Sequence, residues 1–194
     1  MASQNPQDVI ELTFPATLVA DTPATAAPVQ DVVLALFDEC GPGVRRYVAS
    51  FNLDGATTED VVQDVFLALF RHLSLGRPTS NLRGWLFQVA HNLALKHRQR
   101  TMRRGLVEGA WDAACADEIL DGRLNPEERL AERQRQQHLV GVLRLMSDRD
   151  QRCIRLRAEG LCYRDIAKTL GVSLGSVAKS VVRAVSRLSA ADME

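Results

Sequence analysis

A short stretch near the C-terminal end of the chain combines small, hydroxyl and basic residues at spacings that suit contact with DNA. Residues 161–188 read LCYRDIAKTLGVSLGSVAKSVVRAVSRL. Ala167 is small enough for two helices to cross closely, and Gly171 four residues later can adopt the left-handed backbone conformation that ends a helix. Ser173 is placed to cap the helix that follows. The stretch is therefore typical of a helix-turn-helix, whose second helix enters the major groove of DNA.

The second helix of this motif is expected to have two chemically distinct faces. Its apolar residues repeat at four, three and four positions, which predicts one buried stripe of Val177, Val181, Ala184 and Leu188. The remaining face offers short hydroxyls and cations, which suit base edges and phosphates, at Ser176, Lys179, Ser180, Arg183 and Arg187. The alternative is an ordinary solvated helix in a helical hairpin that does not bind DNA.

Composition argues against several other classes of protein. The 194 residues carry 24 basic and 24 acidic side chains, so a general polyanion binder is not indicated. The four cysteines have no short pairing and no histidines at ligand spacing, and we therefore expect neither a disulfide framework nor a metal site. No apolar run is long enough for a membrane span. We expect a cytoplasmic protein with no membrane insertion and no cofactor.

Composition and periodicity divide the chain into four parts. Residues 1–28 are rich in Ala, Thr and Pro and contain acids but no Lys or Arg, which predicts a disordered acidic tail. Residues 29–104 and 126–190 show helical periodicity only, and each is predicted to form a small helical domain, the second a helix-turn-helix domain. Residues 105–125 contain three glycines and little periodicity, which is typical of a flexible linker. The expected fold class is all-α.

The first domain is predicted to contain three helices. We expect the Gly-Pro-Gly stretch at 41–43 to break the first helix and Thr57 or Thr58 to cap the second. Ser80 or Asn81 is placed to cap a long third helix that begins at Leu82.

The third helix is expected to end in a basic run near Arg104. This run, KHRQRTMRR from Lys96, holds five Lys or Arg residues and one His. Such a density is expected where phosphates lie alongside a helix, although a solvated helix end has a similar composition.

Three segments together resemble the bacterial sigma factors of the extracytoplasmic-function (ECF) type, over roughly residues 30–190. They are TTEDVVQDVFLALFRHL from Thr57, LRGWLFQVAHNLALKHRQR from Leu82 and MSDRDQRCIRLRAEGLCYRDIAKTLGVSLGSVAKSVVRA from Met146. The resemblance implies a dissociable initiation subunit that binds core RNA polymerase, directs it to specific promoters and assists promoter opening. It also implies regulation by an anti-sigma factor and no enzymatic activity in the chain itself, because catalysis belongs to the polymerase.

The resemblance implies three groups of site residues. A polar face of the second helix would bind the polymerase through Asp60, Gln63 and Asp64. The third helix and the loop before it would bind the downstream promoter element through Asn81, Arg83, Gln88, His91, Asn92, Lys96, Arg98 and Arg100. The helix-turn-helix would bind the upstream element through Arg164, Ser173, Ser176, Lys179, Ser180 and Arg183.

Two departures from the family pattern keep other functions open. Lys96 stands four residues after Asn92, where the family usually has an acid. The recognition helix has Ala178 and Ser180 where Lys and Arg often stand, so its basic face is thin. The alternatives are a sigma-like decoy that binds an anti-sigma factor and a helix-turn-helix repressor.

Overall fold

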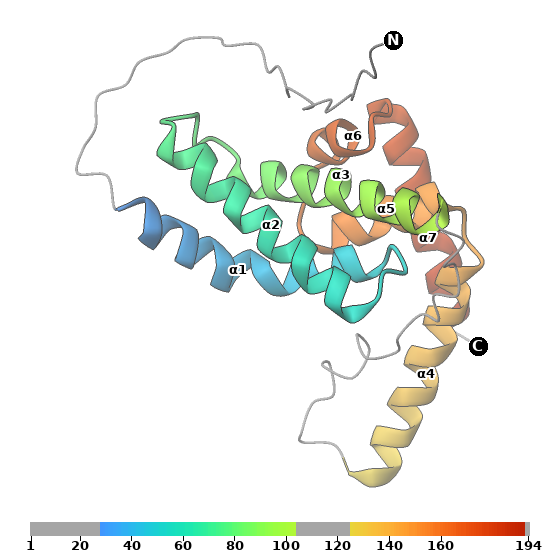
Figure 1. Ribbon diagram of the computed structural model, residues 1–194. Helices are drawn as coiled ribbons and strands as arrows, with labels where there is room; N and C mark the ends of the chain where they lie inside the picture. Colours follow the sequence, from blue (N-terminus) through green and yellow to red (C-terminus); the bar gives the residue numbers. More distant parts are fainter. Residues whose placement is uncertain (1–27, 104–124, 193–194) are drawn as a thin grey trace, which may run out of the picture.

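The protein is built from helices throughout the part that the structure describes. The structure, a computed structural model, describes residues 28–103 and 125–192. The helices in these ranges are α1 (Val29–Ala49), α2 (Gly55–Ser74), α3 (Leu82–Arg103), α4 (Pro126–Arg144), α5 (Asp148–Ala158), α6 (Tyr163–Leu170) and α7 (Leu174–Asp192). Helices α1 to α3 pack together, α5 to α7 form a second group in which α6 lies against α3, and α4 packs against α7 and extends away from both groups (Figure 1). The all-α prediction is confirmed, whereas nearly all of the predicted tail and of the predicted linker lies outside the described residues.

Helix α1 runs without interruption through the Gly-Pro-Gly stretch, so the predicted break is wrong. Proline in a helix interior removes one backbone hydrogen bond and clashes with the preceding turn. In α1, the packing of buried residues outweighs this local preference for a break. Gly41 and Gly43 are buried, and the residues that follow, Val44 and Val48, are fully inaccessible to solvent.

Polar caps define where α2 and α3 begin. Asp54 caps α2, because its Oδ1 accepts a hydrogen bond from the backbone N–H of Thr57 at 2.8 Å, and the predicted threonine caps are therefore wrong. Thr58 is buried instead. At the start of α3, Asn81 Oδ1 accepts from the backbone N–H of Gly84 at 3.0 Å. This bond agrees with one of the two predicted caps.

The helix-turn-helix has the geometry that its sequence predicts. Gly171 ends α6 in the left-handed conformation, with φ of 64°. Ser173 Oγ then accepts a hydrogen bond from the backbone N–H of Ser176 at 3.2 Å, which caps α7. On the inner face of α7, Val177 and Ala184 are fully buried, as their spacing indicates.

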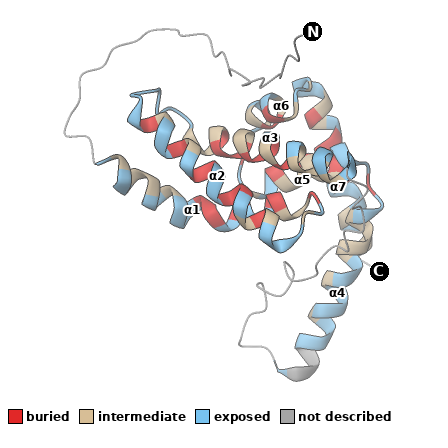
Figure 2. Ribbon diagram, viewed as in Figure 1, coloured by how far each residue is buried: buried red, intermediate tan, exposed pale blue. Residues whose placement is uncertain are grey.

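A single apolar core joins the two halves of the molecule. Buried residues of α1 to α3 such as Phe87 belong to the same cluster as Leu156 of α5, Leu161 of the α5–α6 turn and Ile166 of α6. Figure 2 shows this buried interior continuing from α1 to α3 into α5 to α7, while α4 is largely exposed. The two predicted domains therefore share one core in this structure.

An ion pair between a buried aspartate and a half-exposed arginine joins α5 to α7. Asp150 is 3% exposed, and Arg183 donates to both of its carboxylate oxygens, through Nε and Nη2, at 2.8 Å each. These hydrogen bonds from Arg183 lower the pKa of Asp150 to about 2, against the opposing effect of burial. The pair fixes the rotation of α7 relative to α5.

Two glycines of the helix-turn-helix are expected to respond oppositely to alanine. Gly171→Ala should destabilise the protein by about 1 kcal/mol, because an L-residue is strained at a positive φ. Gly175→Ala is the matched control, since Gly175 lies in the first turn of α7 with open space around its Cβ position and should tolerate alanine or gain stability. Urea unfolding of both variants measures the difference. Equal effects would contradict the assigned backbone conformation.

The Asp150–Arg183 pair should make stability depend on acidic pH. The pKa of Asp150 lies below its unfolded value of about 4, so the stabilisation is fully present above about pH 5 and is lost as the pH falls toward 2. The difference in unfolding free energy between the wild type and Asp150→Asn should therefore be constant above about pH 5 and shrink between pH 4 and 2. Urea titrations across this range test it, and a difference independent of pH would rule the pair out as the cause.

Candidate nucleic-acid interface

The outward face of the helix-turn-helix is smaller than the sequence predicts. Ser173, Lys179 and Arg164 are exposed, and Ser176 is half-buried. Hydroxyls and two cations therefore face solvent on α6 and the first half of α7, where they are available to base edges and phosphates.

Ser180 is not on that face, and this prediction is corrected. Its side chain is only 1% exposed. It follows Val177 by three residues and precedes Ala184 by four, so helical geometry places all three on the same buried stripe. Ser180 therefore belongs to the interior of the helix-turn-helix.

The guanidinium of Arg183 is oriented toward α5. It makes the bidentate pair with Asp150 described above, although its side chain stays 51% exposed. A contact between Arg183 and DNA would have to share or replace this pair.

The basic half of α3 presents a polar edge. Asn92, Lys96 and Arg100 are exposed there, and Gln88 is half-buried one turn before Asn92. Arg98 lies on a different side of the helix, where its Nη1 donates to Asp148 Oδ2 at 3.3 Å. Only part of the predicted downstream set therefore lies free at this edge.

His91 is an interior residue, although the sequence analysis places it among the residues that bind the downstream promoter element. It is 6% exposed, and its Nδ1 lies 2.9 Å from the hydroxyl of Tyr47. Burial, together with the charge of Arg152, lowers the pKa of His91 to about 4, so the ring is neutral near pH 7. A neutral, enclosed imidazole that pairs with a buried tyrosine supports the core and does not reach a nucleic acid in this conformation.

Asn81 and Arg83 contact the helix-turn-helix half of the molecule. Asn81 Nδ2 donates to Asp165 Oδ1 of α6 at 2.7 Å. Arg83 donates to the backbone carbonyl of Glu159 from Nε at 3.0 Å and from Nη2 at 2.7 Å, and its Nη1 donates to Glu39 Oε1 at 2.9 Å. Two of the predicted downstream residues are thus engaged within the protein.

The predicted polymerase-binding residues of α2 all face solvent. Asp60, Gln63 and Asp64 are exposed, whereas Val61 and Val65 on the other side of the same helix are fully buried. The helix therefore separates a polar face from a core face, as its sequence predicts.

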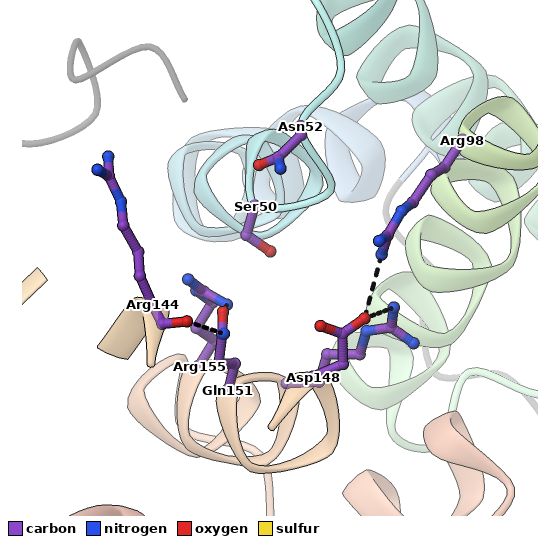
Figure 3. Close-up of a pocket in the computed structure, with 8 residues that line it drawn as sticks. Ser50, Asn52, Arg98, Arg144, Asp148, Gln151 and Arg155 are labelled. Atoms are coloured by element: carbon purple, nitrogen blue, oxygen red, sulfur yellow. Dashed lines mark hydrogen bonds and ion pairs between the residues drawn. The ribbon is translucent and has the colours of Figure 1, made fainter. Parts of the chain in front are cut away.

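An arginine-rich cavity that the sequence analysis missed lies where the two halves meet. It has a volume of about 370 Å³ and is lined by Ser50, Asn52, Arg98, Arg144, Asp148, Gln151, Arg152 and Arg155. Arg98 reaches from α3 to Asp148, which also pairs with Arg152 at 3.3 Å (Figure 3). The sequence contains closely spaced arginines at 149, 152, 155 and 157, which were a signal for such a cavity. The tertiary fold alone brings the other lining residues beside them.

The described residues show no sign of a metal or membrane site. Within ranges 28–103 and 125–192, no group of three or more His, Cys, Asp or Glu residues is arranged to hold a metal ion. In the same ranges, no helix has both the length and the apolar character needed to cross a bilayer.

Comparison with known proteins identifies both halves of the chain. Residues 36–104 match the Sigma-70 region 2 family, and residues 138–188 match the Sigma-70, region 4 family. The chain is 28% identical to the ECF RNA polymerase sigma factor EcfG of Rhodopseudomonas palustris over 149 residues, which cover 77% of this chain and 78% of that one. It is also 28% identical to the ECF RNA polymerase sigma factor SigL of Mycobacterium tuberculosis over 171 residues, or 88% and 94% of the two chains.

Two solved structures have the same fold. One is CnrH in complex with the cytosolic domain of CnrY, with a TM-score of 0.52 and 22% identity over 83% of this chain and 87% of that chain. The other is the sigma factor RpoE in complex with the anti-sigma factor NepR from Bartonella quintana, with a TM-score of 0.57 and 23% identity over 84% and 96%. With both sigma-70 regions present in order on this all-helical fold, the chain belongs to the ECF sigma factors, which are transcription initiation factors of RNA polymerase.

Proposed function

We propose that this protein directs core RNA polymerase to specific promoters and assists their opening, without catalysing a covalent step itself. The observation that carries the proposal is the capped helix-turn-helix, whose exposed face holds Ser173 and Lys179 at the start of α7. We place its action in the cytoplasm, where the polymerase works. The proposed domain boundaries remain 29–104 and 126–190, with residues 105–125 as the connection.

The upstream promoter element would be read by the outward face of the helix-turn-helix. Ser176 and Lys179 lie where base edges would meet α7, and Arg164 of α6 would bind the phosphate backbone. Ser180 would act from the interior, by holding α7 in place. Arg183 would contact DNA only by sharing or replacing its pair with Asp150.

The downstream element would be held along α3. Lys96 and Arg100 supply cations at an exposed edge, and Asn92 supplies a hydrogen-bonding side chain beside them. Melting of a duplex is favoured when the opened strand is captured, because phosphate contacts and stacking offset the cost of unpairing. Asn81 and Arg83 would contribute to DNA binding once their contacts within the protein are released, and Arg98 would do so from another side of α3.

The partners follow from the exposed faces and from the relatives. We propose that core polymerase binds the acidic face of α2 at Asp60, Gln63 and Asp64, which are exposed to solvent. An anti-sigma factor is the proposed regulator, because RpoE was solved in complex with the anti-sigma factor NepR.

A sigma-like decoy is the second candidate. The burial of Ser180 and the pairing of Arg183 reduce the free DNA-binding face of α7, which is the observation that favours it. Transcription by purified core polymerase on fragments of the host genome separates the two functions. New start sites that share two spaced upstream motifs would establish promoter recognition, whereas binding to polymerase or to an anti-sigma factor without new starts would indicate the decoy.

Lys179→Ala should lower promoter-directed transcription about tenfold, because one good base or phosphate contact is worth roughly 1 to 3 kcal/mol. Its matched control is Lys168→Ala, which removes an exposed lysine of α6 outside the proposed contact set. Both variants should bind core polymerase as the wild type does. Unchanged transcription by the Lys179 variant, measured at limiting protein, would show that α7 does not read the promoter through this face.

A further inference from the structure

We infer that the arginine-rich cavity binds a small anion that carries two or more linked phosphate groups. The cavity is lined by residues of α3, α4 and α5 and of the segment that joins α1 to α2. Its volume of about 370 Å³ lies within the range of small-molecule sites, which is about 300 to 1,000 Å³. The inference goes beyond promoter recognition, because it assigns the chain a ligand of its own.

Positive charge is in excess in the cavity. Four arginines and one aspartate line it, which leaves a net of three positive charges, and these residues are Arg98, Arg144, Arg152, Arg155 and Asp148. Figure 3 shows Arg98 and Arg144 on opposite sides of the same opening. Cations held close together repel one another, and a bound anion would relieve that repulsion. Phosphate suits these side chains in particular, because a guanidinium can donate two parallel hydrogen bonds to its oxygens.

The carboxylate within the cavity neutralises its arginines only weakly. A single oxygen of Asp148, Oδ2, accepts from Arg98 Nη1 and from Arg152 Nη2, at 3.3 Å each. The Asp150–Arg183 pair on the same helix is shorter, at 2.8 Å, and the Asp150 side chain is 4% exposed where that of Asp148 is 66% exposed. An ion-pair network that only joins helices is expected to have balanced charges and close contacts. The loose contact of Asp148 leaves donors of Arg98 and Arg152 for a second anion.

Other contacts hold the arginines in position for a ligand. The guanidinium of Arg152 lies 5.1 Å from the centre of the Phe51 ring. Arg155 Nη1 donates to Gln151 Oε1 at 2.9 Å, and Gln151 Nε2 donates to the backbone carbonyl of Met146 at 3.0 Å. Because these contacts restrict the side chains beforehand, less conformational entropy is lost when an anion binds.

The surroundings of the cavity disfavour additional positive charge. Burial, with a smaller contribution from the charge of Arg152, lowers the pKa of Arg155 against the opposing effects of Tyr47 and Asp148. The charge of Arg152 also contributes to the low pKa of His91. An anion placed among these groups would be stabilised by the same field.

The cavity is largely separate from the proposed DNA-binding surfaces. Of its eight lining residues, Arg98 belongs also to the predicted downstream set, whereas Arg144, Arg152 and Arg155 belong to neither DNA-binding set. A nucleic acid spaces its phosphates along a strand, while the cavity gathers four arginines around one volume. Linked phosphates of a small molecule would bring two or three groups into that volume together. The arrangement therefore favours a free polyphosphate anion over a DNA backbone.

Calorimetric titration of the full chain with sodium pyrophosphate, at constant ionic strength, tests the inference. We expect saturable binding of one pyrophosphate per chain and weaker binding of inorganic phosphate, because a single phosphate group reaches fewer arginines. Arg144→Ala and Arg98→Ala should each weaken pyrophosphate binding about tenfold, since each removes a charge-assisted contact. The matched controls are Arg149→Ala of α5 and Arg103→Ala of α3, which remove exposed arginines outside the cavity lining. Screening by salt should keep their effect below about twofold.

Asp148→Asn provides a test of opposite sign. The change releases Arg98 and Arg152 from the carboxylate and adds one net positive charge to the cavity, so pyrophosphate should bind about three- to tenfold more tightly. Asp38→Asn is the matched control, since Asp38 is an exposed acid of α1 outside the lining. Thermal unfolding gives a second readout, because a ligand of the folded state raises Tm. Pyrophosphate should raise Tm most in Asp148→Asn and least in Arg144→Ala, and a cooperative transition shows that each variant is folded.

Three results would overturn the inference. The first is the absence of saturable pyrophosphate binding to the wild type. The second is an equal loss of affinity in Arg144→Ala and Arg149→Ala, which would indicate diffuse attraction to surface charge. The third is tighter binding of a short single-stranded DNA than of pyrophosphate, with loss of that DNA binding in Arg144→Ala, which would make the cavity a contact for a nucleic-acid backbone. These measurements use no polymerase, so failure of the proposed function would appear separately, as absent transcription.

Discussion

The apolar core shared by the two halves is the constraint on which the other features depend. Its members come from α1 to α3 and from α5 to α7, so the halves cannot separate without exposing residues such as Phe87, Leu156 and Leu161. Polar contacts lie at the edge of this core, where Arg46 and Arg83 of the first half donate hydrogen bonds to Glu159 of the second half. Burial of apolar surface stabilises the contact between the halves, and the polar contacts at its edge fix how the halves are oriented relative to each other.

Local signals in the sequence predict the helix-turn-helix well. The left-handed glycine at 171 and the cap at Ser173 depend only on residues a few positions away, and both have the expected geometry. The Gly-Pro-Gly stretch shows the limit of such reasoning. Its local preference for a break is real, but Val44 and Val48 gain more from one continuous buried helix than proline costs.

Contacts distant in sequence explain the errors in the candidate site. His91 is interior because Tyr47, 44 positions earlier, offers its hydroxyl, and the pairing of Arg46 with Glu159 joins residues 113 positions apart. Neither partner can be read from helical periodicity. Ser180 is a different error, because its spacing from Val177 and Ala184 already indicated the buried side, and its hydroxyl alone suggested a solvent-facing role.

The fixed orientation of α7 has a consequence for how the DNA sequence that this protein recognises could change. The Asp150–Arg183 pair and the buried Val177, Ser180 and Ala184 hold the helix at one rotation. Substitutions at the outward positions would therefore alter chemistry at the groove without turning the helix. Duplicated copies of the chain could diverge toward separate sets of genes through very few mutations, each acting nearly independently of folding.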